Sequence, residues 1–320
     1  MILKEKMTKL KVAVQMDSPK VLNKETDSTL AIIEAAIKKK YTVFIYTVDN
    51  LSLKDGLPAA YCKKVINIDI KKNNFLQLSN IQKKKLSDFN VILIRQDPPF
   101  NMNYLTATYF LEKIKKKTII LNDPVAIRNS PEKLLVTNFY QLMPPTLITK
   151  NRSDIDSFLK KHKEFIIKPL YGNGGKNVFY SSLKDPNLPV ILEKFLEDTE
   201  HFILQKFIKN ILKGDKRILL INGEPVGAVN RLPSKNQVRA NLHIGAKAKK
   251  TTLTKRDIQI CKIIKKTLNE KNIFFAGIDV IDRYLTEINI TSPTCIREID
   301  YFNKDNIATK FWNTFEKKYL

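Results

Sequence analysis

Short runs of β-branched and other apolar residues alternate, along the first third of the chain, with polar stretches that repeat at helical spacing. This alternation is typical of parallel sheets covered by helices. Residues 1–128 are therefore expected to form an N-terminal open parallel α/β domain. The pattern predicts strands at 10–16, 43–47, 91–95 and 118–121, and helices at 27–40 and 104–116.

The hydrophobic pattern changes near residue 130, after which the apolar runs become shorter. Residues 129–204 are predicted to form a small α+β lid. Beyond them, Asn222-Gly223 separates two apolar runs, which is a strong signal for a hairpin. Residues 205–320 are therefore expected to form a domain built on an antiparallel sheet, with strands at 274–281 and 285–290 near its end.

Residues 231–250 are polar, basic and only weakly periodic. A connection of this length without a clear element is uncommon inside a compact domain unless it has a function. We therefore predict a functional flap here.

The composition fits a globular chain: 43% of the 320 residues are hydrophobic. No stretch approaches the roughly 20 apolar residues that span a bilayer, and the first eleven residues lack the features of a secretory signal. Three widely spaced cysteines suggest neither a disulfide framework nor a zinc site. We expect a cytoplasmic protein with reduced thiols and no membrane partner.

The formal net charge is +24, which raises the question of nucleic acid. The lysines, however, occur in short scattered runs near the ends of helix-like segments, where they interact favourably with the helix dipole. No helix-turn-helix or aromatic-plus-basic module is visible. A dedicated nucleic-acid groove is therefore not predicted. A nucleic-acid-binding protein stays the alternative function from a different class. The positive charge also suits a small anionic substrate.

Glycine is scarce, yet three of the nine glycines lie in Gly172-Asn173-Gly174-Gly175, directly after a predicted strand. Glycines let backbone N–H groups converge on phosphate oxygens without interference from a Cβ atom. Lys133 and Lys168 could supply the countercharge. The spacing matches neither the Walker A nor the dinucleotide-binding motif, so a simple turn is the alternative.

A second group of candidates lies on the last predicted hairpin. With a turn at 282–284, Asp279 pairs with Glu287, and Glu287 shares a face with Asn289. Two facing carboxylates in an apolar sheet repel each other unless a positive charge lies between them. Magnesium suits such oxygen ligands. The alternative is pairing of the carboxylates with Arg297 or a surface lysine.

Arg95 ends a predicted strand and is followed by a stiff corner at Pro98-Pro99. Strand ends in open parallel sheets are where ligands bind. The guanidinium could hold a carboxylate, although an ordinary surface ion pair is the alternative.

Taken together, these motifs resemble those of bacterial glutathione synthetases, which are ATP-grasp ligases, over essentially the full chain. The run from Leu285 to Glu298, Leu-Thr-Glu-Ile-Asn-Ile-Thr-Ser-Pro-Thr-Cys-Ile-Arg-Glu, is long and highly specific. The other segments that carry the resemblance are 14–17, 27–28, 95–100, 132–134, 167–175, 214–217, 222–226 and 277–281.

The resemblance implies an ATP-grasp fold for the lid and the C-terminal domain, and it implies that the N-terminal domain, residues 1–128, binds substrate. It implies ligation of γ-L-glutamyl-L-cysteine with glycine through an acyl phosphate, giving glutathione, ADP and phosphate. ATP is then a co-substrate and Mg²⁺, with Mn²⁺ as an alternative, the metal. The resemblance also implies a homo-oligomer, a tetramer in the family, and a flap that protects the acyl phosphate from water.

Residue roles follow from the same resemblance. Backbone groups of 205–208 should line the adenine, and Asp215 should lie near the ribose. The expected ATP-binding residues are Lys133, Lys168, Gly172, Gly174, Gly175, Gln205, Lys206, Phe207, Ile208 and Asp215.

Arg217 and Arg231 are expected to neutralise negative charge on the transferring phosphoryl group and the acyl oxygen. The expected metal ligands are Asp279, Glu287 and Asn289. The expected dipeptide-binding residues are Asp27, Ser28, Arg95 and Ser292. The sequence departs from the family pattern at Gln96, where some relatives carry lysine, at Tyr171, where some carry an acidic residue, and at Ala246, which replaces a flap glycine.

Another ATP-grasp carboxylate–amine ligase, such as a D-alanine ligase or a glutamate-adding enzyme, would show a similar hairpin. The Pro98-Pro99 corner and the run 291–298 favour the glutathione-forming enzyme.

Overall fold

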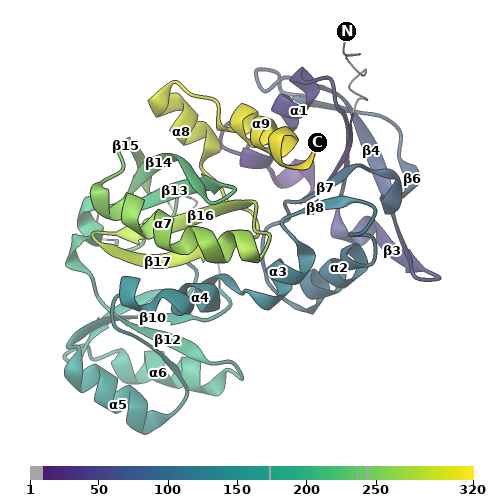
Figure 1. The fold of residues 1–320 in the computed structure, drawn as a ribbon. Helices are drawn as coiled ribbons and strands as arrows, with labels where there is room; N and C mark the ends of the chain where they lie inside the picture. Colours follow the sequence, from purple (N-terminus) through teal and green to yellow (C-terminus); the bar gives the residue numbers. More distant parts are fainter. Residues whose placement is uncertain (1–9, 173, 236, 243–244) are drawn as a thin grey trace.

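The computed structural model describes residues 10–172, 174–235, 237–242 and 245–320. These residues form an eight-stranded, a four-stranded and a five-stranded sheet (Figure 1). Position 173 of the glycine loop and positions 236, 243 and 244 of the predicted flap lie outside the described residues. None of the described helices is both long and apolar enough to cross a bilayer.

The first sheet has a parallel centre, as predicted, and the order of its strands is β2-β1-β7-β8. Helix α1 begins after Asp27, whose carboxylate accepts a hydrogen bond from Leu30 N at 2.7 Å. One face of the sheet packs against α1 and α9, and the other against α2 and α3. The elements are β1 (Lys11–Gln15), α1 (Ser28–Lys38), β2 (Thr42–Tyr46), β7 (Val91–Ile94), α2 (Met102–Glu112), β8 (Ile119–Leu121), α3 (Pro124–Asn129) and α9 (Ile307–Tyr319).

Four further strands extend this sheet in a region where the sequence predicted none. The long β4 pairs with all the others and also runs antiparallel to β2. Its exposed positions include the apolar residues Leu57, Tyr61 and Ile66, so the two-residue alternation is weak, but Asp55-Gly56 is a hairpin signal that could have been used. The strands are β3 (Leu51–Lys54), β4 (Leu57–Ile68), β5 (Leu76–Leu78) and β6 (Gln82–Lys85).

The four-stranded sheet has the antiparallel order β11-β10-β12-β9, and helices α5 and α6 share an apolar cluster with it. The elements are β9 (Thr146–Thr149), α5 (Arg152–Lys161), β10 (Glu164–Pro169), β11 (Phe179–Ser182), α6 (Leu188–Glu197) and β12 (Phe202–Lys206). The sequence pattern predicts strands at 146–149 and 164–168 and a helix at 153–161, which match β9, β10 and α5, but it predicts neither β11 nor α6.

The five-stranded antiparallel sheet has the order β15-β14-β13-β16-β17. Helix α7 packs on one face, and α8 and α9 pack on the other. The predicted flap is shorter than expected, because its two ends belong to β14 and β15. The elements are β13 (Asp215–Ile221), β14 (Glu224–Leu232), β15 (Lys247–Lys250), α7 (Lys255–Glu270), β16 (Phe275–Ile281), β17 (Tyr284–Asn289) and α8 (Ile296–Asn303).

Short helices complete the description. They are α4 (Glu132–Leu135) and the 3₁₀ helices η1 (Pro19–Val21), η2 (Val48–Asn50), η3 (Leu86–Asp88), η4 (Val136–Leu142) and η5 (Lys209–Lys213).

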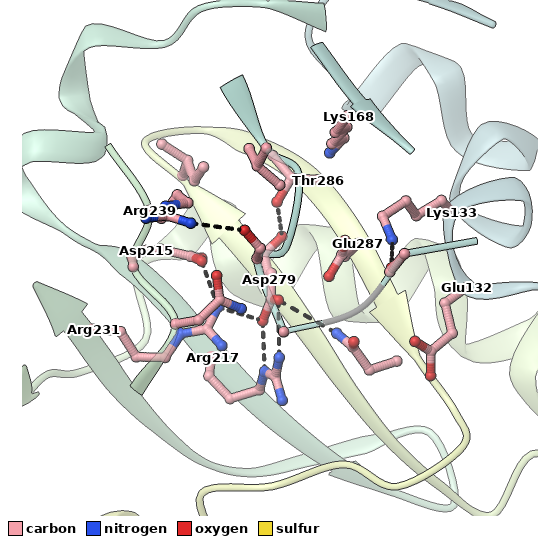
Figure 2. A pocket seen from close by; sticks show the side chains of 18 of the residues that line it. Glu132, Lys133, Lys168, Asp215, Arg217, Arg231, Arg239, Asp279, Thr286 and Glu287 are labelled. Atoms are coloured by element: carbon pink, nitrogen blue, oxygen red, sulfur yellow. Dashed lines mark hydrogen bonds and ion pairs between the residues drawn. The ribbon is translucent and has the colours of Figure 1, made fainter. Parts of the chain in front are cut away.

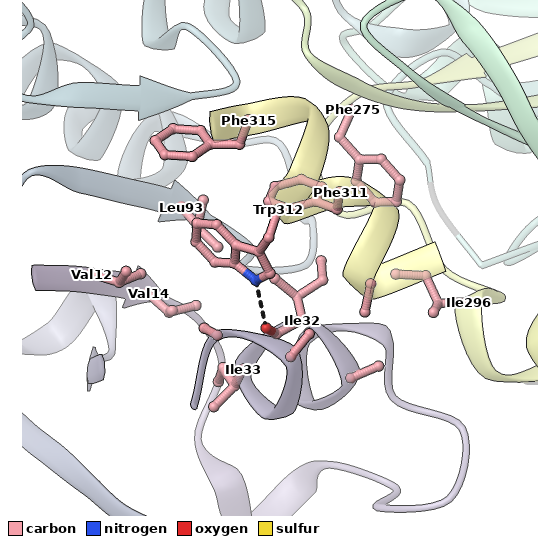
Figure 3. Packing of buried hydrophobic residues seen from close by; sticks show 14 of the residues in the cluster. Val12, Val14, Ile32, Ile33, Leu93, Phe275, Ile296, Phe311, Trp312 and Phe315 are labelled. Atoms are coloured by element: carbon pink, nitrogen blue, oxygen red, sulfur yellow. Dashed lines mark hydrogen bonds between the residues drawn. The ribbon is translucent and has the colours of Figure 1, made fainter. Parts of the chain in front are cut away.

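Helix α9 joins the first and third sheets into one body. Trp312 on this helix is fully buried, and its Nε1 donates to the Ile32 carbonyl in α1 at 2.9 Å (Figure 3). Phe311, its neighbour, packs edge-on against Phe275 of β16. The C-terminal helix therefore sets the position of the N-terminal sheet relative to the third sheet.

Asn122, just after β8, forms a second connection between the two sheets. Its Nδ2 donates to the carbonyls of Phe275 and Ile290, both at 2.7 Å, while its Oδ1 accepts from the N–H groups of Phe274 and Phe275 at 2.8 Å. The side chain is buried and uses both ends of its amide. It thereby fixes the chain entering the second half of the molecule against β16 and β17.

Candidate active site

A cavity of about 490 Å³ lies between the four-stranded and five-stranded sheets (Figure 2). Strands β10 and β12 and the glycine loop line one side, and β13, β16 and β17 line the other. The cavity brings together every predicted ATP-binding and metal residue, both predicted arginines and Ser292. Asp27, Ser28 and Arg95 lie outside its lining.

The hairpin of β16 and β17 pairs Asp279 with Glu287, which confirms the predicted register. The route to this pairing differs from the prediction. The turn contains two residues, Asp282 and Arg283, and a register shift at Thr286 then restores the pairing. Thr286 Oγ1 donates to the Asp279 carbonyl at 3.1 Å, which supports the irregular step in the ladder.

Asp279 is held by two arginines from the neighbouring strands. Arg217 donates from Nε to Oδ1 at 2.5 Å and from its terminal nitrogen to Oδ2 at 2.9 Å. Arg231 lies 3.0 Å from Oδ1. All three side chains are buried. Burial alone raises the pKa of Asp279, but the two guanidinium groups outweigh burial and hold this pKa below its ordinary value.

Asp215 completes this buried cluster. It lies opposite Arg231 in the β13–β14 pairing and accepts a hydrogen bond from that guanidinium. Its Oδ1 has no hydrogen-bond partner. Burial, opposed by Arg231 but reinforced by the nearby charge of Asp279, raises the pKa of Asp215 to about 7.

These contacts contradict the electrostatic argument for a metal, which assumed that no other positive charge lies near the two facing carboxylates. The protein itself supplies positive charge to both carboxylates: Arg217 and Arg231 bind Asp279, and Lys133 Nζ lies 3.7 Å from Glu287 Oε1. The predicted alternative partner Arg297 is also wrong, because it pairs with Glu34 at 3.2 Å.

The donor chemistry nevertheless fits Mg²⁺. Asp279, Glu287 and Asn289 line the cavity from one hairpin and offer only oxygen ligands. The Asn289 Nδ2 group donates to the Gly277 carbonyl at 3.2 Å, which leaves its oxygen as the available ligand. Among the described residues, no group of three His, Cys, Asp or Glu side chains could hold a metal. A magnesium ion here therefore needs further ligands from phosphate and water.

Two lysines face this hairpin across the cavity. Lys168 is buried, and burial lowers its pKa although the charge of Glu287 opposes the shift. Its Nζ donates to Gln205 Oε1 at 3.3 Å. Lys133 donates to the carbonyl of Gly172 and thereby connects α4 to the glycine loop. Both ammonium groups are placed to contact an anionic ligand.

The predicted adenine-lining segment, residues 205–208, also borders the cavity. Two of its backbone groups are already used: Lys206 N donates to the Pro145 carbonyl at 2.9 Å, and Phe207 N donates to the Glu164 carbonyl at 3.1 Å. The Phe207 ring packs against Tyr180 with 4.5 Å between ring centroids. These contacts fix the segment at the end of β12.

Arg239, from the flap between β14 and β15, reaches the glycine loop. Its guanidinium donates to the Gly175 carbonyl at 3.2 Å, and the flap residues 238–242 line the cavity. Gly174 and Gly175 have φ values of 62° and 75°, which favour glycine. The flap and the glycine loop therefore meet over the same cavity.

The four predicted dipeptide-binding residues lie close together, but their hydrogen bonds are made to one another's segments of the chain. Ser292 Oγ donates to the Arg95 carbonyl at 3.2 Å, and Arg95 donates to the Pro293 carbonyl at 2.9 Å. Ser28 Oγ accepts from Ile296 N at 3.1 Å. Arg95 also donates to Thr29 at 3.1 Å. These residues hold segment 291–297 against the N-terminal sheet.

Sequence reasoning assigned no role to Glu132, although it is next to Lys133 in a motif that was noticed. Its buried carboxylate accepts hydrogen bonds from Ile290 N at 2.8 Å, Thr291 N at 3.0 Å and Thr291 Oγ1 at 2.7 Å. Burial raises its pKa despite these bonds. Glu132 thus ties α4 to the end of β17. A charged residue beside a predicted phosphate-binding lysine was the available signal.

Two family models match the chain. The N-terminal domain of prokaryotic glutathione synthetase matches residues 10–128, and the ATP-grasp domain of prokaryotic glutathione synthetase matches residues 132–304. Together they cover most of the chain.

Curated relatives are similar over nearly their whole length. A glutathione synthetase from Brucella melitensis is 46% identical over 97% of this chain and 99% of its own, and one from Agrobacterium fabrum is 47% identical over 98% of both. A glutathione synthetase from Buchnera aphidicola is 41% identical over 96% of both.

Among solved structures, the D-cycloserine synthetase DcsG superimposes with a TM-score of 0.68 at 13% identity, covering 96% of this chain and 99% of that one. An ATP-grasp ligase associated with a modified peptide in Chryseobacterium gregarium gives a TM-score of 0.64 at 18% identity, covering 97% and 98%. At such identities the likeness shows the fold alone, which is that of the ATP-grasp ligases.

Proposed function

The chain belongs to the prokaryotic glutathione synthetase family of ATP-dependent ligases, and we propose that it joins γ-L-glutamyl-L-cysteine to glycine in the cavity between its second and third sheets. The products are glutathione, ADP and phosphate. In this proposal the cysteinyl carboxylate attacks the γ-phosphate of ATP, and the glycine amine then displaces phosphate from the resulting acyl phosphate.

One observation carries the proposal: the cavity places Lys133 and Lys168 on one side and the Asp279–Glu287 hairpin with its two arginines on the other. Phosphoryl transfer needs little covalent chemistry from the protein and depends on positioning and on stabilising negative charge. A cavity lined by these cations supplies both.

The residue roles follow from this placement. Lys133 and Lys168 bind the phosphates of ATP, and residues 205–208 border the base. Arg217 and Arg231 stabilise charge on the transferring phosphoryl group and the acyl oxygen while Asp279 holds their orientation. The flap excludes water, because the acyl phosphate is otherwise hydrolysed before glycine attacks.

Asp279, Glu287 and Asn289 would hold Mg²⁺, with Mn²⁺ as an alternative. The ion would neutralise negative charge on the β- and γ-phosphates of ATP. A homo-oligomer, a tetramer by family resemblance, and a cytoplasmic location are further parts of the proposal. Light scattering coupled to size-exclusion chromatography checks the oligomeric state.

The test is an assay of ADP release with the purified protein. Turnover is expected only when γ-glutamylcysteine, glycine and ATP are all present, with one ADP formed for each glutathione. ADP release that continues unchanged when either amino-acid substrate is omitted contradicts the assignment. A panel of other amines and carboxylates identifies a ligase of different specificity.

A further inference from the structure

Helix α4 is a single turn of four residues, yet two of its side chains, Glu132 and Lys133, line the candidate active-site cavity (Figure 2). Pro131 precedes the helix and makes no side-chain cap. Helices shorter than about 12 residues are not stable on their own in water. Contacts from outside the helix must therefore fix the place of Lys133.

The contacts of the Lys133 ammonium group are not sufficient for this. The group donates to the carbonyl of Gly172 in the glycine loop, and it lies 3.7 Å from Glu287 Oε1 on β17. A lysine side chain is a flexible four-carbon stem, so its backbone can shift while such contacts persist. The place of the ammonium group thus depends on what holds α4 beside β17.

Glu132, the neighbour of Lys133, makes this connection. Its Oε1 accepts three hydrogen bonds, from Ile290 N at 2.8 Å, Thr291 N at 3.0 Å and Thr291 Oγ1 at 2.7 Å. Hydrogen bonds to an ionised acceptor are roughly twice as strong as neutral ones. Three of them on one oxygen atom attach α4 to the chain directly after β17.

The end of β17 is held independently of Glu132. The Ile290 carbonyl accepts from Asn122 Nδ2 at 2.7 Å, and Ile290 is fully buried. Asn289 pairs with Gly277 across the hairpin, and its Nδ2 donates to the Gly277 carbonyl at 3.2 Å. The strand end is therefore the fixed part of this contact, and α4 is the part that is positioned.

We propose that Glu132 is a positioning residue for nucleotide binding: it holds α4 on the end of β17 and thereby sets the distance of the Lys133 ammonium group from the metal-binding hairpin. The inference rests on the proposed function, in which Lys133 binds the phosphates of ATP. A metal ion that bridges phosphate oxygens fixes the phosphates relative to the hairpin, so the lysine must lie at a matching distance. Glu132 acts through Lys133 and does not itself contact the nucleotide.

Three variants separate this role from others. Glu132→Ala removes all three hydrogen bonds, and Glu132→Gln keeps an oxygen acceptor without the charge. Thr291→Val keeps the shape of the side chain and removes one of the three bonds. Glu193→Ala, at an exposed position outside the cavity, is the matched control. Calorimetry measures the binding of Mg·ADP and of adenosine to each full-length variant.

We expect Glu132→Ala to raise the Kd for Mg·ADP about 10-fold, a loss typical when a residue that orients a ligand-binding group is removed. The Kd for adenosine should not change, because adenosine carries no phosphate for Lys133. Glu132→Gln should recover most of the affinity for Mg·ADP. Thr291→Val should show a smaller loss, again with Mg·ADP alone. KM for glycine should stay at the wild-type value in all variants.

A double-mutant cycle with Lys133→Met tests whether Glu132 acts through the lysine. Residues that act through one another give losses that do not add. Glu132→Ala should therefore weaken Mg·ADP binding far less in the Lys133→Met background than in the wild type. Glu193→Ala should leave the affinity unchanged in both backgrounds.

Additive losses in the cycle would overturn the proposal, as would an equal loss of affinity for adenosine. A lowered Tm with unchanged Mg·ADP affinity would show a purely structural role and overturn it as well. So would a Glu132→Gln variant as weak as Glu132→Ala, because charge rather than position would then matter.

If Glu132→Ala does not fold, Thr291→Val gives the same test, alone and combined with Lys133→Met. Absence of γ-glutamylcysteine turnover by the wild type rejects the proposed substrates but leaves these binding measurements intact. Failure of the proposed function and failure of this inference are therefore distinguishable.

Discussion

Asp279 of β16 and Arg217 of β13 face each other directly in the antiparallel pairing and are joined by two hydrogen bonds of 2.5 and 2.9 Å. This bidentate geometry is the strongest form of a carboxylate–guanidinium contact. Asp279 therefore orients an arginine, and in the proposed magnesium site it would also offer lone pairs to the metal. Glu287, which only approaches Lys133, is the freer carboxylate.

Replacing Glu287 with Gln should therefore reduce magnesium-dependent turnover strongly while leaving the fold intact. We expect the Mg²⁺ concentration for half-maximal rate to rise about 10- to 100-fold. This is the loss of metal affinity that is typical when a ligand, or a residue that orients a ligand, is removed. Phosphate release measured over a magnesium titration checks this. The exposed Glu193→Gln is the matched control, and a near-normal titration removes Glu287 from the metal site.

Replacing Arg217 with Met should destabilise the protein and abolish most activity. The change leaves a buried carboxylate without its bidentate partner, for which losses of about 3 kcal/mol are typical. Urea unfolding measures the free energy of unfolding, and the exposed Arg152→Met controls for a surface change of the same type. Stability within about 0.5 kcal/mol of wild type contradicts the importance of this pair.

Asp215 gives a prediction about pH. Its pKa is raised from 3.8 to about 7 in the fold, chiefly by burial. Protonation at this site therefore stabilises the folded state fully below the unfolded pKa, and this contribution is lost as the pH rises through 7.

Asn cannot ionise, so Asp215→Asn escapes this loss. The free energy of unfolding of the variant relative to wild type should rise by about 2 kcal/mol between pH 5 and pH 8. Urea unfolding at both pH values measures the difference. A difference that stays constant, or falls, with increasing pH shows that the site does not hold a proton in this window.

Arg239 connects the flap to the Gly175 carbonyl. This contact leads to a prediction about how tightly phosphate release is coupled to glutathione formation. Replacing Arg239 with Gln should loosen flap closure and admit water to the acyl phosphate. Phosphate released per glutathione formed should rise clearly above one, with the largest excess at low glycine. Arg283→Gln, at an exposed position outside the cavity lining, serves as a control. A ratio that stays at one in the variant rules out a role for this contact in protecting the intermediate.

The sequence predicted the parts of this molecule that depend on neighbours close along the chain. The parallel strands β1, β2, β7 and β8, the Asn222-Gly223 hairpin and the pairing of Asp279 with Glu287 all follow from local hydrophobic period and short turns. The family resemblance then supplied the cavity residues. The strands β3 to β6 were missed because exposed apolar residues, Leu57, Tyr61 and Ile66, mask the two-residue alternation on β4.

Only the tertiary structure decided which charges meet. Arg217 and Asp279 are 62 positions apart, and they pair because β13 lies beside β16 in the sheet. Arg95 meets Pro293 across 198 positions. Periodicity along a strand says which face a side chain takes, but the order of strands in a sheet and the packing of one sheet on another set its neighbours. The partners of these buried charges, and hence their pKa values, could therefore be known only from the folded chain.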